Sequence, residues 1–259
     1  MLGLGTAVTN IDSANIYKEL SELNNYADLD IHFDFSTIEG TNGIDVTAVK
    51  NAGQAGVTNT IDSAEGTPYL DTITLSRHCV AFAGSDDILD FNTSYTTSGK
   101  PCTFFIVIQR IDVSNDYVVA NAHDGATDFV RFTASGATIQ TAMAGETAVS
   151  TNTNSTAQST IDYTQVAQVT TVLAFRRVTN GSIYFYADNG LYIAAKSNAA
   201  IKAAANFTLG AIGGTTSGSL ADLTGYIGEV GLYDADIGEE AIITLTKELS
   251  TKWGVNRRL

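Results

Sequence analysis

The sequence predicts an all-β fold, a two-sheet antiparallel sandwich of the jelly-roll type with a short helix near each end of the chain. Several segments alternate apolar and polar residues with the period of two that a half-buried strand requires. Turn signals such as Asn180-Gly181 separate such segments. The composition, with 23 Gly and only 2 Pro, suits short strands joined by tight turns. We expect roughly a dozen strands.

Length and charge limit the possible functions. A chain of 259 residues can enclose one large core, and we divide it into an N-terminal arm with a short helix (1–27) and a sandwich domain (28–259). The formal net charge of −14 disfavours nucleic acid or an anionic membrane as a partner. No apolar run approaches the roughly 20 residues of a membrane span. The start lacks the pattern of a secretory signal, so we expect synthesis in the cytoplasm.

The first ten residues carry no charge, and Leu2, Leu4 and Val8 make them apolar. Two interpretations are open: a frayed terminus, or an arm that orders against a neighbouring subunit. A short helix is predicted next, over residues 13–24, with Ile16, Leu20 and Leu23 on one face. Arm and helix lie outside the predicted sandwich, which makes them a suitable attachment device.

Residues 28–35 form the clearest alternating strand. Its inward residues are Leu29, Ile31, Phe33 and Phe35, and its outward residues are Asp28, Asp30, His32 and Asp34. The outward set has metal-ligand chemistry, but neighbours on one face of a strand are about 7 Å apart, so we expect a solvated strand and no metal. The adjacent pair Asp86-Asp87 is expected to stabilise its own turn, with calcium binding as the alternative.

The middle of the chain predicts further strands. Short strands are expected at 45–49 and 56–61, a pair at 117–121 and 129–133, and more short strands over 134–146, followed by a polar loop at 150–160. Residues 102–109 are apolar on both faces, which predicts a central strand. Cys79 and Cys102 are expected to be buried thiols, and a disulfide between them is the alternative.

The strongest hairpin signal joins residues 169–177 to residues 182–188. Its second strand places Tyr184 and Tyr186 on one face, which we interpret as the outer face. Exposed tyrosines stack on sugar rings and also lie in protein interfaces, so both kinds of contact remain open for these two residues.

The C-terminal segment predicts a strand at 225–233 and a helix at 238–252. Glycines inside the strand indicate either the close approach of another backbone or a bend in the sheet. Strict alternation places Tyr226, Gly228, Val230 and Leu232 on one face and Ile227, Glu229, Gly231 and Tyr233 on the other. Asp236 is expected to cap the helix, with Glu239 completing a capping box. Trp253 is expected to be buried beside Leu249.

This ending resembles that of concanavalin A-like (laminin G-like) β-sandwich modules, and the resemblance covers about residue 28 to the end. The matching residues are Gly225, Ile227, Glu229, Tyr233, Lys252, Trp253 and Gly254. The segment from Phe82 to Leu89 resembles the F-x-G-x-D-D-x-L segment of the same family. The ending is similar to that of structural proteins of tailed-bacteriophage virions.

The resemblance implies a non-enzymatic structural component of a phage particle: a capsid decoration, fibre or tail protein. Such a protein would be located in the virion, as a homo-oligomer in contact with other virion proteins. The alternative is a glycan-binding module for host-surface attachment, and a polysaccharide-degrading enzyme is a weaker alternative.

Catalytic patterns are missing from the sequence. Glucan-cleaving enzymes of this fold carry E-x-D-x-E or E-x-D-x-x-E on one strand, and no Glu here is followed two residues later by Asp. The three histidines, His32, His78 and His123, have no metal-binding spacing. We therefore expect no catalytic residue, no metal site and no cofactor, with calcium as the open exception.

Overall fold

The computed structural model describes residues 29–84, 87–97, 101–111, 116–120, 129–135, 138–144, 159–164, 167–179, 182–196, 208–213 and 221–255. The predicted arm with Leu2, Leu4 and Val8, the predicted helix at 13–24, and most of the polar loop at 150–160 lie outside these residues. Within them, no helix is both long enough and apolar enough to cross a membrane.

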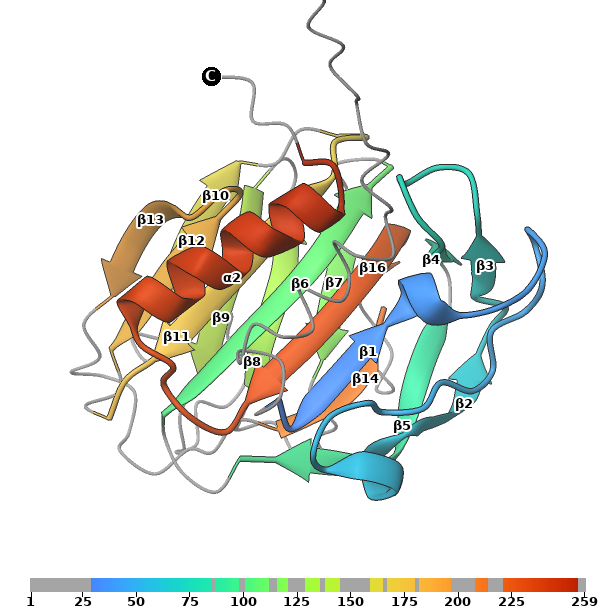
Figure 1. Ribbon diagram of the computed structural model, residues 1–259, viewed down its shortest axis with the longest axis horizontal. Helices are drawn as coiled ribbons and strands as arrows, with labels where there is room; N and C mark the ends of the chain where they lie inside the picture. The colour runs from blue at the N-terminus through green and yellow to red at the C-terminus, as the bar shows by residue number, and fades with distance from the viewer. Residues whose placement is uncertain are drawn as a thin grey trace, which may run out of the picture.

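Two eight-stranded sheets form a sandwich (Figure 1). The front sheet has the order β13 (Leu191–Lys196), β12 (Ile183–Ala187), β11 (Thr171–Arg177), β6 (Cys102–Arg110), β16 (Thr224–Tyr233), β4 (Cys79–Ala83) and β3 (Tyr69–Asp71), and β1 (Ile31–Asp34) pairs with β16. The back sheet has the order β10 (Ser159–Thr164), β9 (Thr138–Ala144), β8 (Phe129–Ser135), β7 (Asp116–Ala120), β14 (Thr208–Ile212), β5 (Ile88–Thr96) and β2 (Ile61–Glu65). All these pairings are antiparallel, and only β15 (Ala221–Asp222) runs parallel to its partner, β7.

Helix α2 (Glu239–Lys252) lies across the outer face of the front sheet, over β11, β12 and β6 (Figure 1). The main core fills the space between the sheets and includes Phe33, Phe104 and Phe175. A second core lies between the front sheet and α2, where Phe105 and Val107 meet Leu245, Leu249 and Trp253. The predicted sandwich with a C-terminal helix is confirmed.

Local sequence patterns correctly predicted several elements of the front sheet. All four inward residues of the first strand, Leu29, Ile31, Phe33 and Phe35, are fully buried. Strand β6 is buried along its whole length between β11 and β16, as the apolar run predicts. The predicted hairpin is present as β11 and β12. Cys79 and Cys102 are buried free thiols.

One predicted strand is wrong. Gly56–Asn59 forms a 3-10 helix, and the second such helix is Phe35–Thr37. In the predicted strand at 45–49, only single bridges form, at Asp45 and Val49. These segments contain turn residues whose local preferences compete with strand pairing.

A β-bulge in β16 makes the faces on which its side chains lie differ from the predicted ones. The register with β6 shifts between Ile227 and Glu229, which adds an extra residue, Gly228, to β16. Ile227 therefore packs between the sheets together with Val230, whereas Tyr226 lies on the helix side. The strict alternation assigned Tyr226 and Ile227 to the wrong faces, because the bulge reverses the alternation at that point.

The start of α2 differs from the predicted capping box. The helix begins at Glu239, and its N-cap is Gly238, which has φ 86° and no side-chain hydrogen bond to the helix. The Asp236 carboxylate instead accepts a hydrogen bond from the Gly238 N–H and forms an ion pair with Arg176. The pairing with Arg176, 60 residues away in the sequence, replaces the local cap.

Candidate functional site

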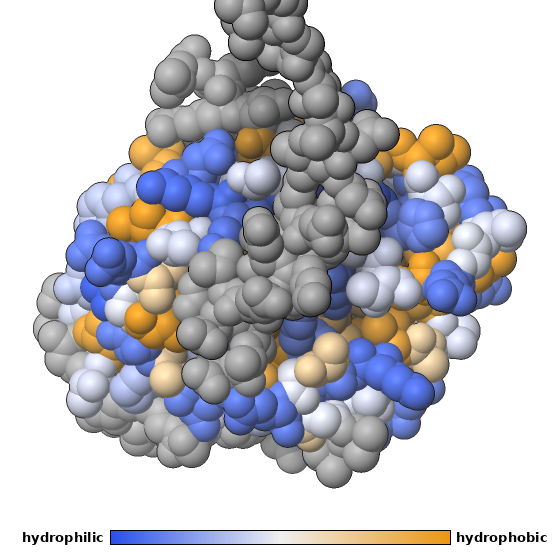
Figure 2. Space-filling view, in the orientation of Figure 1, coloured by the Kyte–Doolittle hydropathy of each residue, from blue (hydrophilic) through white to orange (hydrophobic). Residues whose placement is uncertain are grey.

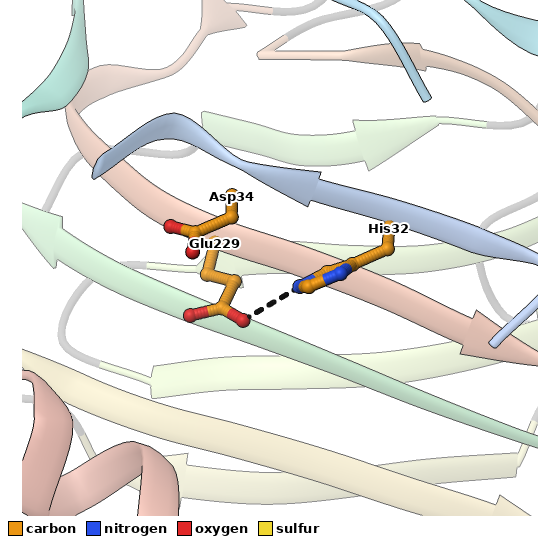
Figure 3. A group of neighbouring side chains, drawn as sticks. All are labelled: His32, Asp34 and Glu229. Carbon is orange, nitrogen blue, oxygen red and sulfur yellow. Dashed lines mark hydrogen bonds and ion pairs between the residues drawn. The ribbon is translucent and has the colours of Figure 1, made fainter. Parts of the chain in front are cut away.

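A buried charge network joins the first strand, the bulged strand and the end of α2. Glu229 on β16 is fully buried, and His32 and Asp34 point toward it from β1 (Figure 3). The distance from His32 Nε2 to Glu229 Oε1 is 2.8 Å. The Trp253 Nε1–H donates to Glu229 Oε2 over 2.9 Å. The Lys252 ammonium lies 2.6 Å from Glu229 Oε2 and 2.7 Å from Asp34 Oδ2.

The network keeps its two principal groups ionised. Burial alone would raise the pKa of Glu229, but the Lys252 charge and the His32 hydrogen bond outweigh burial and lower this pKa to about 2. Burial would lower the pKa of Lys252, but the Glu229 and Asp34 carboxylates raise it above its usual value. Carboxylate and ammonium therefore form an ion pair across the neutral pH range.

His32, Asp34 and Glu229 are also spaced closely enough to be considered as metal ligands, since their ligand atoms lie within 4.8 Å of one another. Lys252 decides against this assignment, because its ammonium already bridges the two carboxylates. The second Asp34 oxygen accepts from the N–H and hydroxyl of Ser36. We assign the cluster as an ion-pair network that fastens α2 to the sheet.

Sequence reasoning did not find this network. It predicted a solvated position for His32 and Asp34 and did not place Glu229 beside them. The pairing of β1 with β16 places Asp34 opposite Glu229, 195 positions later in the chain. The one signal in the sequence was that Glu229, Lys252 and Trp253 all belong to the C-terminal motif that resembles the family. In the structure, Lys252 and Trp253 both donate to Glu229.

The predicted contact tyrosines occupy different environments. Tyr186 is fully buried, because α2 covers the outer face of β12, so the interpretation of Tyr186 as an exposed residue is wrong. Tyr184 is half-buried, and the Arg176 guanidinium lies 4.5 Å from the centre of its ring. Among the described residues, Tyr192 on the edge strand β13 is 48% exposed and makes an edge-to-face contact with Tyr186. Its exposure follows from its position on an edge strand, which the sequence alone did not identify.

Asp87 has the role in its turn that we expected. One carboxylate oxygen accepts from the Thr67 N–H and the other from the Ala83 N–H, and the residue is almost fully buried. Asp86 lies outside the described residues. Calcium binding by the pair Asp86-Asp87, the alternative interpretation, stays a prediction.

No protein-family model matches the sequence, and no curated protein matches it. Solved structures do match. One is domain 4 of AbnA, a GH43 extracellular arabinanase from Geobacillus stearothermophilus, in complex with arabinotriose: identity is 13%, the TM-score is 0.57, and the match covers 86% of this chain and 100% of that one. A second is the receptor binding domain of botulinum neurotoxin C/D mosaic serotype, with 9% identity and a TM-score of 0.56. That match covers 85% of this chain and 51% of the toxin chain.

These likenesses agree with the architecture built above. Two antiparallel sheets, a helix on one outer face and the match over a whole solved domain define a two-sheet antiparallel β-sandwich. This architecture is consistent with the concanavalin A-like fold that the C-terminal motif resembles. At these identities the likeness concerns the fold alone.

Proposed function

We propose that this protein is a lectin-like module that binds a glycan without cutting it. The observation that carries the proposal is the match to the arabinanase domain, which was solved in complex with arabinotriose and is covered over its full length. The lack of paired catalytic carboxylates in the sequence agrees with a binding role.

The buried charge network supports binding rather than catalysis. A glycosidase requires a carboxylic acid that can protonate the glycosidic oxygen near neutral pH. Glu229 has no exposed surface, and its pKa of about 2 keeps it ionised. Asp34 shares the Lys252 ammonium with it. These two carboxylates are therefore structural groups.

A second function is compatible with the first: a structural component of a tailed-phage particle that displays this sandwich. It is supported by the resemblance of the C-terminal motif and by the uncharged N-terminal stretch with Leu2, Leu4 and Val8. In this proposal the protein is located in the virion as a homo-oligomer, contacts other virion proteins and presents the sandwich to a host glycan.

A sedimentation assay with insoluble polysaccharides tests the first function. Protein is incubated with arabinan, cellulose, chitin or bacterial exopolysaccharide, with EDTA or with about 1 mM calcium, which would saturate even a weak site. We expect protein in the pellet with at least one polysaccharide and no released sugar in the supernatant. Release of reducing sugar would identify an enzyme, and absence from every pellet would contradict glycan binding.

Mass spectrometry of purified particles tests the second function. Particles from cultures that encode this protein should contain it in a fixed ratio to the major capsid protein. A protein found only in the soluble fraction, as a folded monomer that never joins particles, would refute the virion proposal. This result would not affect the proposal of glycan binding, which the sedimentation assay tests.

A further inference from the structure

The outer face of the front sheet beside the start of α2 combines tyrosines of β12 and β13 with a charged residue of β11 and one of the turn before α2. We call Tyr184, Tyr192, Arg176 and Asp236 the β12–β13 patch. Tyr192 exposes about half of its surface, and Tyr184 lies on the same side of the sheet, next to buried Tyr186. On this side of the molecule, hydrophilic residues are interspersed with hydrophobic ones (Figure 2). Such a surface suits a polar ligand better than a large apolar partner.

The patch is held in place before any ligand arrives. The Arg176 Nη1 lies 3.1 Å from both carboxylate oxygens of Asp236, and the guanidinium packs over the Tyr184 ring. The ring of Tyr192 rests on Tyr186, with 5.7 Å between the ring centres. Since these side chains are already ordered by their neighbours, binding would cost little of their conformational entropy.

We infer that the β12–β13 patch binds an uncharged saccharide, with Tyr192 as the stacking ring; this inference rests on the proposed glycan-binding function. The amphipathic ring of a tyrosine offers an apolar face to the C–H groups of a sugar and a hydroxyl for hydrogen bonding. The Asp236 side chain is partly exposed, and its Oδ2, which accepts from Arg176, has a second lone pair that a sugar hydroxyl could use. Arg176 is already engaged by Asp236, and Glu239 at the start of α2 adds a further negative charge. Lys247, whose side chain lies beside Gly190, balances Glu239, so the patch has no net positive charge to attract a sialic or uronic acid, and a neutral sugar is favoured.

A printed array of matched glycans tests the inference. Each core glycan is present in a neutral form and in a form that carries a sialic or uronic acid. Full-length protein should bind neutral members and bind their acidic counterparts more weakly. Tyr192→Ala should weaken neutral binding roughly three- to tenfold, as loss of one aromatic contact does. Tyr192→Phe should retain most of it, because the ring remains.

The matched control is Ile73→Ala. Ile73 is 74% exposed and follows β3, at the opposite edge of the front sheet, so its loss should leave the array signal unchanged. If Tyr192→Ala binds neutral glycans as well as the unmodified protein, the sugar is bound elsewhere and the inference fails while the proposed function stands. A preference for acidic glycans would overturn the assigned ligand class. If the unmodified protein binds no glycan, the proposed function fails and this inference with it.

Discussion

The indole ring of Trp253 packs directly against the backbone of Gly228. A Cβ placed on Gly228 would lie 2.6 Å from the ring carbon Cη2, which is far inside van der Waals contact. Gly228 is the extra residue of the bulge in β16, and the residue after it, Glu229, accepts the indole N–H. The residue that ends α2 is thus fixed to the sheet at a point where only glycine leaves room for it.

Gly228→Ala should destabilise the fold by about 1–3 kcal/mol, because the added methyl group overpacks the contact with the indole. Trp253→Ala should cost about 3–5 kcal/mol, as large core truncations do. Urea unfolding of both single variants and the double variant measures their coupling. The methyl group has space once the ring is gone, so the double variant should cost less than the sum of the two. Additive costs would show that the two residues act independently.

Lys252→Met should cost about 3–5 kcal/mol, since it leaves the Glu229 carboxylate buried without its ammonium. Glu229→Gln combined with Lys252→Met should be more stable than Lys252→Met alone, because the fully buried position 229 then carries no unpaired charge. Lys247→Met is the control: this lysine is on the same helix but exposed, and its loss should change stability by less than about 0.5 kcal/mol. Equal effects of the two lysine variants would contradict the assigned network.

The stability difference between the unmodified protein and Glu229→Gln should depend on pH. The pKa of Glu229 is about 2 in the folded protein against an ordinary value of 4.5. Its contribution is therefore complete above about pH 4.5 and is lost as the pH falls toward 2. Urea unfolding at pH 7, 4 and 2.5 should show the difference shrinking in that order. A constant difference would mean that the carboxyl is not ionised by the network.

The arm prediction concerns residues 1–10. Deleting them should leave the sandwich folded, because described residues from Leu29 onward already form both cores. The deletion should abolish oligomerisation or attachment to the particle, since it removes Leu2, Leu4 and Val8 from an otherwise acidic chain. Light scattering and particle sedimentation check this. If the truncated protein assembles as well as the full-length protein, the attachment surface lies on the sandwich itself.

Local periodicity was sufficient to predict much of the fold. Alternation in residues 28–35, the apolar run at 102–109 and the helical stripe at 238–252 each reflect burial of one element against its neighbours, and this burial leaves a direct trace in the sequence. The burial of Trp253 beside Leu249 followed from the same stripe.

Features that depend on distant partners could not be predicted from local pattern. The bulge at Gly228 is set by the register between β16 and β6 together with the indole above it. The burial of Tyr186 depends on which strands α2 covers. Asp236 forms an ion pair with Arg176 instead of capping α2, and this depends on the position of Arg176. In each case a tertiary contact overrides a valid local preference.

Native mass spectrometry with a mixture of neutral oligosaccharides tests the central claim most directly, because one spectrum reports both binding and cleavage. We expect a peak at the mass of the protein plus one intact oligosaccharide, with no shorter sugars appearing during incubation. Protein peaks without any bound oligosaccharide, or the appearance of shortened products, would contradict it.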